Sequence, residues 1–150
     1  MVLILGVDPG SRATGYGIIE VLRNKLVHVD SGTFRLDQVS LQARLLMLHE
    51  NLSLVIERYK PSEASVEKVF VNRNVDSALK LGHARGVILL SVAKHSLPTS
   101  EYTATQIKRS TVGRGHASKE QVQHMVRAIL NLERTPSPDA SDALAAAICH

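Results

Sequence analysis

The sequence is poor in several residue types that mark particular classes of protein. Its 150 residues include one cysteine, Cys149, no tryptophan, two phenylalanines and three tyrosines. A single cysteine excludes an internal disulfide framework. No apolar run approaches the ~20 residues of a membrane span, and the apolar start of the chain is too short for the core of a signal peptide. We therefore expect a cytoplasmic protein.

The overall composition is that of one globular domain. Apolar residues make up 44% of the chain and charged residues 21%, and the absence of a low-complexity tract argues against disorder. A chain of this length can build a full core, so we expect a single domain over residues 1–150.

Positive charge is concentrated in two segments, although the net charge of the whole chain is only +4. Residues 103–136 carry six Lys and Arg against two acidic residues, and residues 68–85 carry four against one. Clustered basic residues are typical of a surface that binds a polyanion such as nucleic acid. Ordinary solvated helix faces are the alternative explanation.

The start of the chain predicts an antiparallel meander. A buried strand over residues 3–8 ends in Asp8 and a Pro-Gly turn, and two more strands are expected over 15–22 and 25–36. An unpaired carboxylate at the end of a core strand is costly. Asp8 therefore either accepts hydrogen bonds from the turn or binds something.

The remainder alternates helices with short strands, which indicates an α/β protein. Apolar residues at steps of three and four predict a helix from an N-cap at Ser40 to Tyr59. The next strand, over 64–70, is expected to lie parallel to the first one. The later elements are expected to be a helix over 76–95, a strand over 98–102, a short helix over 105–110, a loop over 111–117, a helix capped by Ser118 and a final helix over 139–148.

Small residues recur on the helix predicted over 76–95. Ala78, Gly82 and Gly86 lie four residues apart, so they form a ridge that permits close approach of another helix. That helix can belong to the same subunit or to a second copy of the chain.

Four carboxylates lie where acidic residues are uncommon. Asp8 ends a core strand, Glu67 lies inside an apolar strand, and Asp139 and Asp142 share one face of the last helix. Each also has an ordinary explanation. Asp8 can accept hydrogen bonds from the Pro-Gly turn, Glu67 can point to solvent, and Asp139 and Asp142 can interact favourably with the dipole at the helix N-terminus. A parallel crossover nevertheless makes Asp8 and Glu67 neighbours, and a last helix packed across that edge of the sheet brings all four together.

Clustered carboxylates raise one another's pKa values unless a cation neutralises them. Oxygen ligands, without cysteine or paired histidines, suit Mg²⁺ or Mn²⁺ rather than Zn²⁺. Two such ions about 3.5–4 Å apart support in-line phosphoryl transfer. The sequence therefore predicts two Mg²⁺ ions, with Mn²⁺ as a substitute, held by Asp8, Glu67, Asp139 and Asp142.

Five motifs in register resemble one family over nearly the whole chain. They are Leu5-Gly-Val-Asp-Pro-Gly-Ser-Arg12, Val66-Glu-Lys-Val-Phe-Val71, Asn74-Val-Asp-Ser-Ala-Leu-Lys-Leu-Gly82, Lys119-Glu-Gln-Val-Gln-His-Met-Val126 and Asp139-Ala-Ser-Asp-Ala-Leu-Ala145. Together they resemble the RuvC Holliday-junction resolvases of bacteria. This resemblance implies a ribonuclease H-like fold, with a mixed five-stranded sheet, made of a three-strand antiparallel meander plus parallel strands, flanked by helices on both faces.

The resemblance also implies an activity and partners. A member of this family is expected to be a cytoplasmic, homodimeric, Mg²⁺-dependent crossover junction endodeoxyribonuclease. It would resolve four-way DNA junctions by paired symmetric nicks in homologous recombination and DNA repair. A partnership with the RuvA–RuvB branch-migration complex is implied in the same way.

Residue by residue, the resemblance assigns roles to the same four carboxylates and to others. Asp8, Glu67, Asp139 and Asp142 match the catalytic metal-binding carboxylates, and the family tolerates histidine at the position of Asp139. Three further matches are Lys119, a catalytic lysine near the scissile phosphate, Lys108, a basic residue at the DNA surface, and Phe70, an aromatic residue that contacts bases near the junction centre. We expect other DNA contacts within the two basic segments, at Arg73, Asn74, Lys80 and Arg114.

Three other functions are less well supported by the sequence. Proteins of the actin, Hsp70 and sugar-kinase superfamily have a similar first turn, but they need two domains and a second phosphate loop. A YqgF-type nuclease shares the fold, but Phe70 and the motif over 74–86 favour the resolvase. A DNA-binding module that has lost catalysis is not expected to keep all four carboxylates.

Overall fold

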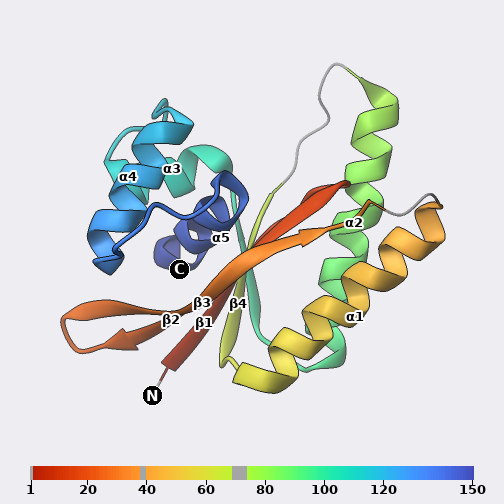
Figure 1. Cartoon of the computed structure of the whole chain (residues 1–150), viewed down its shortest axis with the longest axis horizontal. Helices are drawn as coiled ribbons and strands as arrows, with labels where there is room; N and C mark the ends of the chain where they lie inside the picture. Colours follow the sequence, from red (N-terminus) through yellow and green to blue (C-terminus); the bar gives the residue numbers. More distant parts are fainter. Residues whose placement is uncertain (1, 38–39, 69–73) are drawn as a thin grey trace.

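The computed structural model describes residues 2–37, 40–68 and 74–150, which form a mixed sheet with helices on both faces (Figure 1). The strands are β1 (Val2–Asp8), β2 (Ala13–Leu22), β3 (Lys25–Arg35), β4 (Glu63–Glu67) and β5 (Thr99–Tyr102). The helices are α1 (Leu41–Tyr59), α2 (Val75–Lys94), α3 (Ala104–Val112), α4 (Lys119–Leu130) and α5 (Pro138–Cys149). No helix in these ranges is both long and apolar enough to cross a membrane.

The sheet has the predicted topology, with strand order β3-β2-β1-β4-β5. The first three strands form the antiparallel meander, and β4 pairs parallel to β1. Because Val7 is the register partner of Val66, the next residues along the two strands, Asp8 and Glu67, lie side by side. The parallel crossover therefore places both carboxylates at one edge of the sheet.

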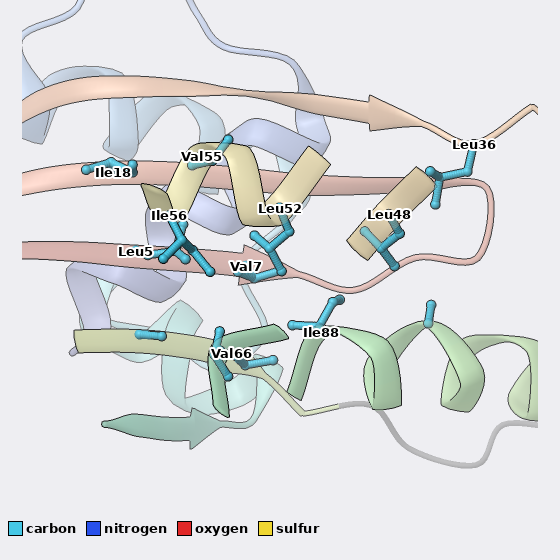
Figure 2. Packing of buried hydrophobic residues seen from close by; sticks show 13 residues of the cluster. Leu5, Val7, Ile18, Leu36, Leu48, Leu52, Val55, Ile56, Val66 and Ile88 are labelled. Carbon is cyan, nitrogen blue, oxygen red and sulfur yellow. The ribbon is translucent and has the colours of Figure 1, made fainter. Parts of the chain in front are cut away.

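Helices α1 and α2 cover one face of the sheet, and their apolar stripes form its core (Figure 2). Ser40 caps α1 as predicted, since its hydroxyl accepts a hydrogen bond from the backbone N–H of Ala43 at 3.1 Å. The buried residues of this layer include Leu5, Val7, Ile18, Leu36, Leu48, Leu52, Val55, Ile56, Val66 and Ile88.

Helix α5 packs directly on the opposite face, over β1 and β2, with α3 and α4 behind it (Figure 1). Its first turn reaches the strand ends that carry Asp8 and Glu67, as predicted, and the rest of the helix runs along this face of the sheet. The physical reason for this packing is a path of bare backbone on the two strands. A Cβ atom added at Gly6 would lie 2.0 Å from the carbonyl oxygen of Ala143, and one at Gly15 would lie 2.0 Å from that of Asp139.

Two predicted boundaries also differ from the structure. Strand β4 ends at Glu67 because its partner β5 ends at Tyr102, to whose carbonyl oxygen the N–H of Lys68 donates; residues 69 and 70 lie outside the described residues. The predicted loop over 111–117 begins only at Gly113. The Thr111 hydroxyl donates to the carbonyl oxygen of Ile107, and α3 continues until Gly113 adopts φ +87°.

Candidate active site at the ends of β1 and β4 and the start of α5

Asp8 and Glu67 meet at the ends of β1 and β4, where their side chains share a hydrogen bond. A hydrogen bond between two carboxyl groups requires a proton on one of them. Asp8 was expected either to hold the Pro-Gly turn or to bind another group. It contacts Glu67, and the turn is held by another residue. The Thr14 hydroxyl accepts from the N–H of Gly10 at 3.2 Å and donates to its carbonyl oxygen at 3.0 Å.

Asp139 and Asp142 reach the same place from the first turns of α5. Ser137 caps this helix as predicted, accepting from the N–H of Ala140 at 3.2 Å, with Pro138 in the first turn. The Ser137 hydroxyl also lies 3.2 Å from that of Thr33 on β3. The start of α5 is thereby tied to the sheet, and the spacing of three residues turns both carboxylates toward Asp8.

The crowding is strongest at Asp8, and it changes the acidity of this residue. Burial is the first cause, the hydrogen bond with Glu67 the second, and repulsion from Glu67, Asp142 and Asp139 adds to both; together they raise the pKa of Asp8 to about 10. Protonation of Asp8 at neutral pH is therefore favoured in the metal-free protein. The four carboxylates thus form one interacting cluster.

Asp142 is also perturbed, and its neighbours show which cations face the cluster. Burial and the charge of Glu67 raise the pKa of Asp142 to about 6, while the ammonium groups of Lys119 and Lys108 act in the opposite direction. Lys119 is the first residue of α4, and Lys108 lies on α3. Two of the predicted basic residues are therefore close enough to act on the cluster.

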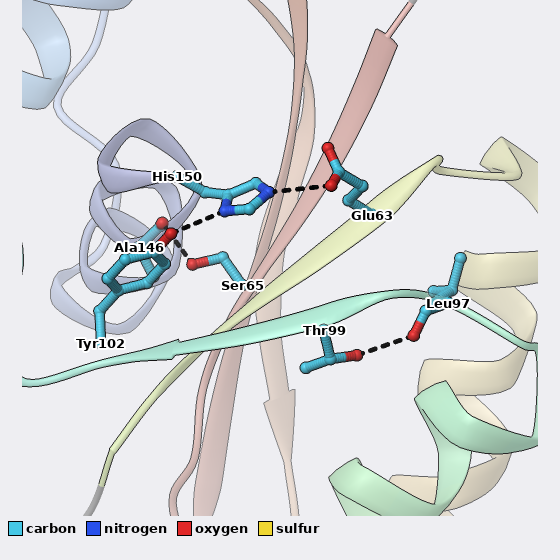
Figure 3. Close-up of polar contacts among 7 residues, drawn as sticks. All are labelled: Glu63, Ser65, Leu97, Thr99, Tyr102, Ala146 and His150. Carbon is cyan, nitrogen blue, oxygen red and sulfur yellow. Dashed lines mark hydrogen bonds and ion pairs between the residues drawn. The ribbon is translucent and has the colours of Figure 1, made fainter.

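Helix α5 is also fixed to the sheet in its second half, away from the end that carries the carboxylates. The buried Ser65 hydroxyl, two residues before Glu67 on β4, donates to the carbonyl oxygen of Ala146 at 2.6 Å (Figure 3). At the far end, His150 bridges two strands: its Nδ1 lies 2.8 Å from the Tyr102 hydroxyl, and its Nε2 lies 3.3 Å from Oε1 of Glu63. These contacts set the height of α5 above the strands.

The donor chemistry of the cluster fits a hard divalent cation. Its members offer only carboxylate oxygens, which suit Mg²⁺ or Mn²⁺, and the proton shared by Asp8 and Glu67 occupies a position that a cation can replace. Within the described ranges, no three Asp, Glu, His or Cys side chains are spaced as a complete ligand set. Binding therefore requires the side chains to draw together around the ion as that proton leaves.

The other predicted DNA-contacting residues lie outside the cluster. Phe70 and Arg73 fall outside the described residues. Asn74 caps α2, with its Oδ1 accepting from two N–H groups, and Lys80 forms an exposed ion pair with Asp76 at 3.2 Å. Arg114 is exposed on the loop after α3.

Sequence reasoning missed the residues that position the site. Gly6, Gly15 and Gly17 admit α5, Thr14 holds the turn, and Ser65 binds the helix backbone. One available signal was the alternation of glycines on the first two strands together with the five alanines of residues 140–147, which is the composition of a close helix–sheet contact.

The mixed sheet, with carboxylates at the ends of β1 and β4 and on a helix lying over them, defines a ribonuclease H-like fold. Comparison with known families identifies the branch. Residues 4–150 match the model of the family described as "Crossover junction endodeoxyribonuclease RuvC". The chain belongs to this family.

Individual relatives agree with the family match. The chain is 54% identical to crossover junction endodeoxyribonuclease RuvC of Geobacter sulfurreducens over 148 residues, which cover 98% of this chain and 90% of the relative. It is 51% identical to the protein of the same name from Aeromonas salmonicida, covering 100% of this chain and 87% of the relative.

Solved structures resemble the whole chain as well. The structure of Thermus thermophilus RuvC in complex with a Holliday junction substrate has a TM-score of 0.93 at 32% identity, covering 100% of this chain and 93% of that one. The yeast mitochondrial Holliday junction resolvase Ydc2 shares the fold, with a TM-score of 0.66 at 11% identity, covering 97% of this chain and 77% of that one.

The raised pKa of Asp8 predicts that Asp8→Asn stabilises the metal-free protein. The pKa of Asp8 is about 10 in the folded protein, above its usual value of 3.8, so the free energy of unfolding falls as the pH rises above 3.8. The loss has an upper limit of about 4 kcal/mol at pH 7, at 1.36 kcal/mol per pH unit. Asn cannot ionise, so in EDTA we expect Asp8→Asn to gain roughly 1–4 kcal/mol at pH 7 and almost nothing near pH 4.

Chemical denaturation at several pH values measures this difference. Asp76→Asn is the matched control, because this carboxylate is exposed, lies in the first turn of α2 and pairs with Lys80; we expect a slight loss of stability. A variant Asp8→Asn that is no more stable than wild type at pH 7 would contradict the proposed crowding.

Proposed function

We propose that this chain is a Mg²⁺-dependent endonuclease that resolves four-way DNA junctions as a homodimer. The observation that carries the proposal is the convergence of Asp8, Glu67, Asp139 and Asp142 from three separate elements. Nucleases of the RuvC family are metal-dependent, and the choice of Mg²⁺ rests on the all-oxygen donor set.

Each side chain of the site has a distinct task in phosphodiester hydrolysis. Asp8 and Glu67 would hold one ion from the sheet, and Asp139 and Asp142 would complete the site from α5. When bound, a pair of such ions supplies activation of water and neutralisation of charge on the leaving oxygen. Lys119 and Lys108, which face Asp142, would bind the scissile phosphate and stabilise its developing charge.

An apolar face on the opposite side of the molecule supports the homodimer. Leu79 and Leu90 of α2 are 59% and 57% exposed, and a Cβ atom added at Gly82 or Gly86 would meet nothing within 4 Å. The two glycines of the ridge noted in the sequence therefore make no close contact within the described part of this chain. Leu79, Gly82, Gly86 and Leu90 follow one another at steps of three and four residues, which places them on one helix face, available to a second copy.

Two-fold symmetry links the dimer to the substrate. An isologous dimer presents two identical sites, and a four-way junction has nearly two-fold symmetry, so one dimer can nick two opposing strands. Binding to the DNA backbone should fall steeply with salt, whereas selectivity for a junction would come from its shape and deformability. A role with RuvA–RuvB, in the bacterial cytoplasm, is proposed from family membership.

A cleavage assay tests the activity. With Mg²⁺, the wild-type protein should nick a four-way junction and leave a linear duplex of the same sequence intact, and EDTA should abolish nicking. Asp8→Asn removes one ligand of the metal ions, which stabilise the charge of the transition state by several kcal/mol. We therefore expect the cleavage rate to fall roughly 10³-fold while junction binding is retained.

Asp76→Asn is again the control and should cleave at the wild-type rate, since Asp76 is exposed and lies on α2. Nicking of the junction that survives Asp8→Asn, or equal cleavage of junction and duplex, would refute the proposed activity.

A substitution in the apolar face tests the homodimer. Leu90→Glu places a charge in the proposed seam, so light scattering should give a dimer for wild type and a 16.4 kDa monomer for the variant. The variant should still nick, but its two nicks should no longer be made together. Leu22→Glu, an exposed apolar position on β2 that is 39% accessible, is the control.

We expect Leu22→Glu to remain dimeric and to make paired nicks. A wild-type protein that stays monomeric at tens of micromolar, with and without junction DNA, would contradict the homodimer. A Leu90→Glu variant that remains dimeric would remove α2 from the interface.

A further inference from the structure

A small polar cavity lies at the turn that follows Asp8 and takes no part in the chemistry described above. It has a volume of about 250 Å³ and is lined by Arg12, Leu36, Asp37 and Arg44. Arg12 belongs to the turn that follows Asp8, and Arg44 lies near the start of α1. The cavity therefore lies between the turn after β1 and the start of α1.

The two arginines have unused hydrogen-bonding capacity. The Nε of Arg44 is buried and has no hydrogen-bond partner in the described part of the chain. Neither Arg12 nor Arg44 is within ion-pair distance of an acidic side chain in those ranges, although Asp37 lines the same cavity. A buried unsatisfied donor is destabilising, so its presence is explained by a partner that the described part of the chain does not supply.

The backbone around the cavity is fixed before any ligand arrives. The N–H of Leu36 donates to the carbonyl oxygen of Arg12 at 2.7 Å, which ties the turn to the end of β3. On the other wall, the N–H of Arg44 donates to the carbonyl oxygen of Ser40, the N-cap of α1. The first turn of α1 carries no acidic residue, so the positive end of the helix dipole is not neutralised there.

These features favour a phosphate group as the ligand. Guanidinium groups bind phosphate oxygens through paired N–H donors, and two arginines with one aspartate leave a net positive charge in the cavity. Because Arg12 is only four residues from Asp8, a DNA strand whose scissile phosphate lies at Asp8 would have neighbouring phosphates within its reach.

We propose that Arg12 and Arg44 together bind one phosphate of the DNA backbone, distinct from the phosphate that is cleaved. This inference rests on the proposed function for its substrate, and it adds a contact to the DNA strand from the turn after β1 and from α1. Asp37 limits the affinity of this cavity by repelling the anion.

Salt-dependent binding to a four-way junction, measured without divalent cations, tests the contact. Each phosphate contact contributes about −0.9 to the slope of log K against log salt concentration. We expect Arg12→Gln and Arg44→Gln each to weaken binding roughly tenfold and to reduce that slope by about 1. The double variant should lose little more than either single variant, because both remove the same contact.

Two further variants separate this contact from general effects of charge and stability. Arg23→Gln, an exposed arginine in the β2–β3 turn, makes the same change in net charge at the far end of the sheet and should leave affinity and slope unchanged. Asp37→Asn should strengthen binding, which is opposite to the effect expected of a merely damaged protein. If Arg44→Gln does not fold, Arg12→Gln and Asp37→Asn still decide the question, since Arg12 is exposed.

Calorimetry with inorganic phosphate distinguishes the two sources of the ligand. Loss of the DNA contact without measurable binding of free phosphate supports a backbone phosphate. Free phosphate that binds wild type but not Arg12→Gln, with unchanged DNA binding, overturns the DNA contact and assigns the cavity to a free anion. If wild type binds the junction and Arg12→Gln has the same affinity and slope, the inference is wrong while the proposed function stands; if wild type does not bind the junction, the proposed function itself fails.

Discussion

The candidate active site depends on the close packing of α5 against the bare backbone of β1 and β2. Gly6, Gly15 and Gly17 leave no side chain between the helix and the strands, and Ser65 adds a hydrogen bond from the neighbouring strand to the helix backbone (Figure 3). A helix held at this height carries Asp139 and Asp142 over the end of β1. The site is therefore built on regular elements rather than on loops, which favours a well-defined geometry.

The candidate active site and the proposed dimer surface lie on opposite faces of the sheet. One face carries α5, with the carboxylates at its start and α3 and α4 supplying Lys108 and Lys119, while the other carries α1 and α2 (Figure 1). The carboxylate cluster lowers the stability of the metal-free protein because it forces Asp8 to keep a proton, and such local destabilisation is common where a site is built for a ligand. The apolar surface of α2 is available for association without disturbing the opposite face.

Much of this arrangement could be predicted from the sequence, because local patterns determine it. Apolar runs separated by turns predicted the meander, and the N-cap with apolar periodicity predicted the helix after Ser40. The order strand, helix, strand predicted the parallel crossover, which makes Asp8 and Glu67 neighbours. The close approach of α5 to the sheet could not be predicted, because it depends on how a helix packs on glycine backbone in strands more than 120 residues away. The unsatisfied Nε of Arg44 likewise becomes visible only when the turn after Asp8 and the start of α1 are placed together.

In the proposed metal site, the four carboxylates act together and Asp8 holds a proton until an ion binds. Calorimetric titration of the protein with Mg²⁺ at pH 7, in buffers of different ionisation enthalpy, measures the protons released on binding. We expect binding to release about one proton and Asp8→Asn to abolish this release. Binding of Mg²⁺ without proton release, or no binding at millimolar concentrations, would contradict it.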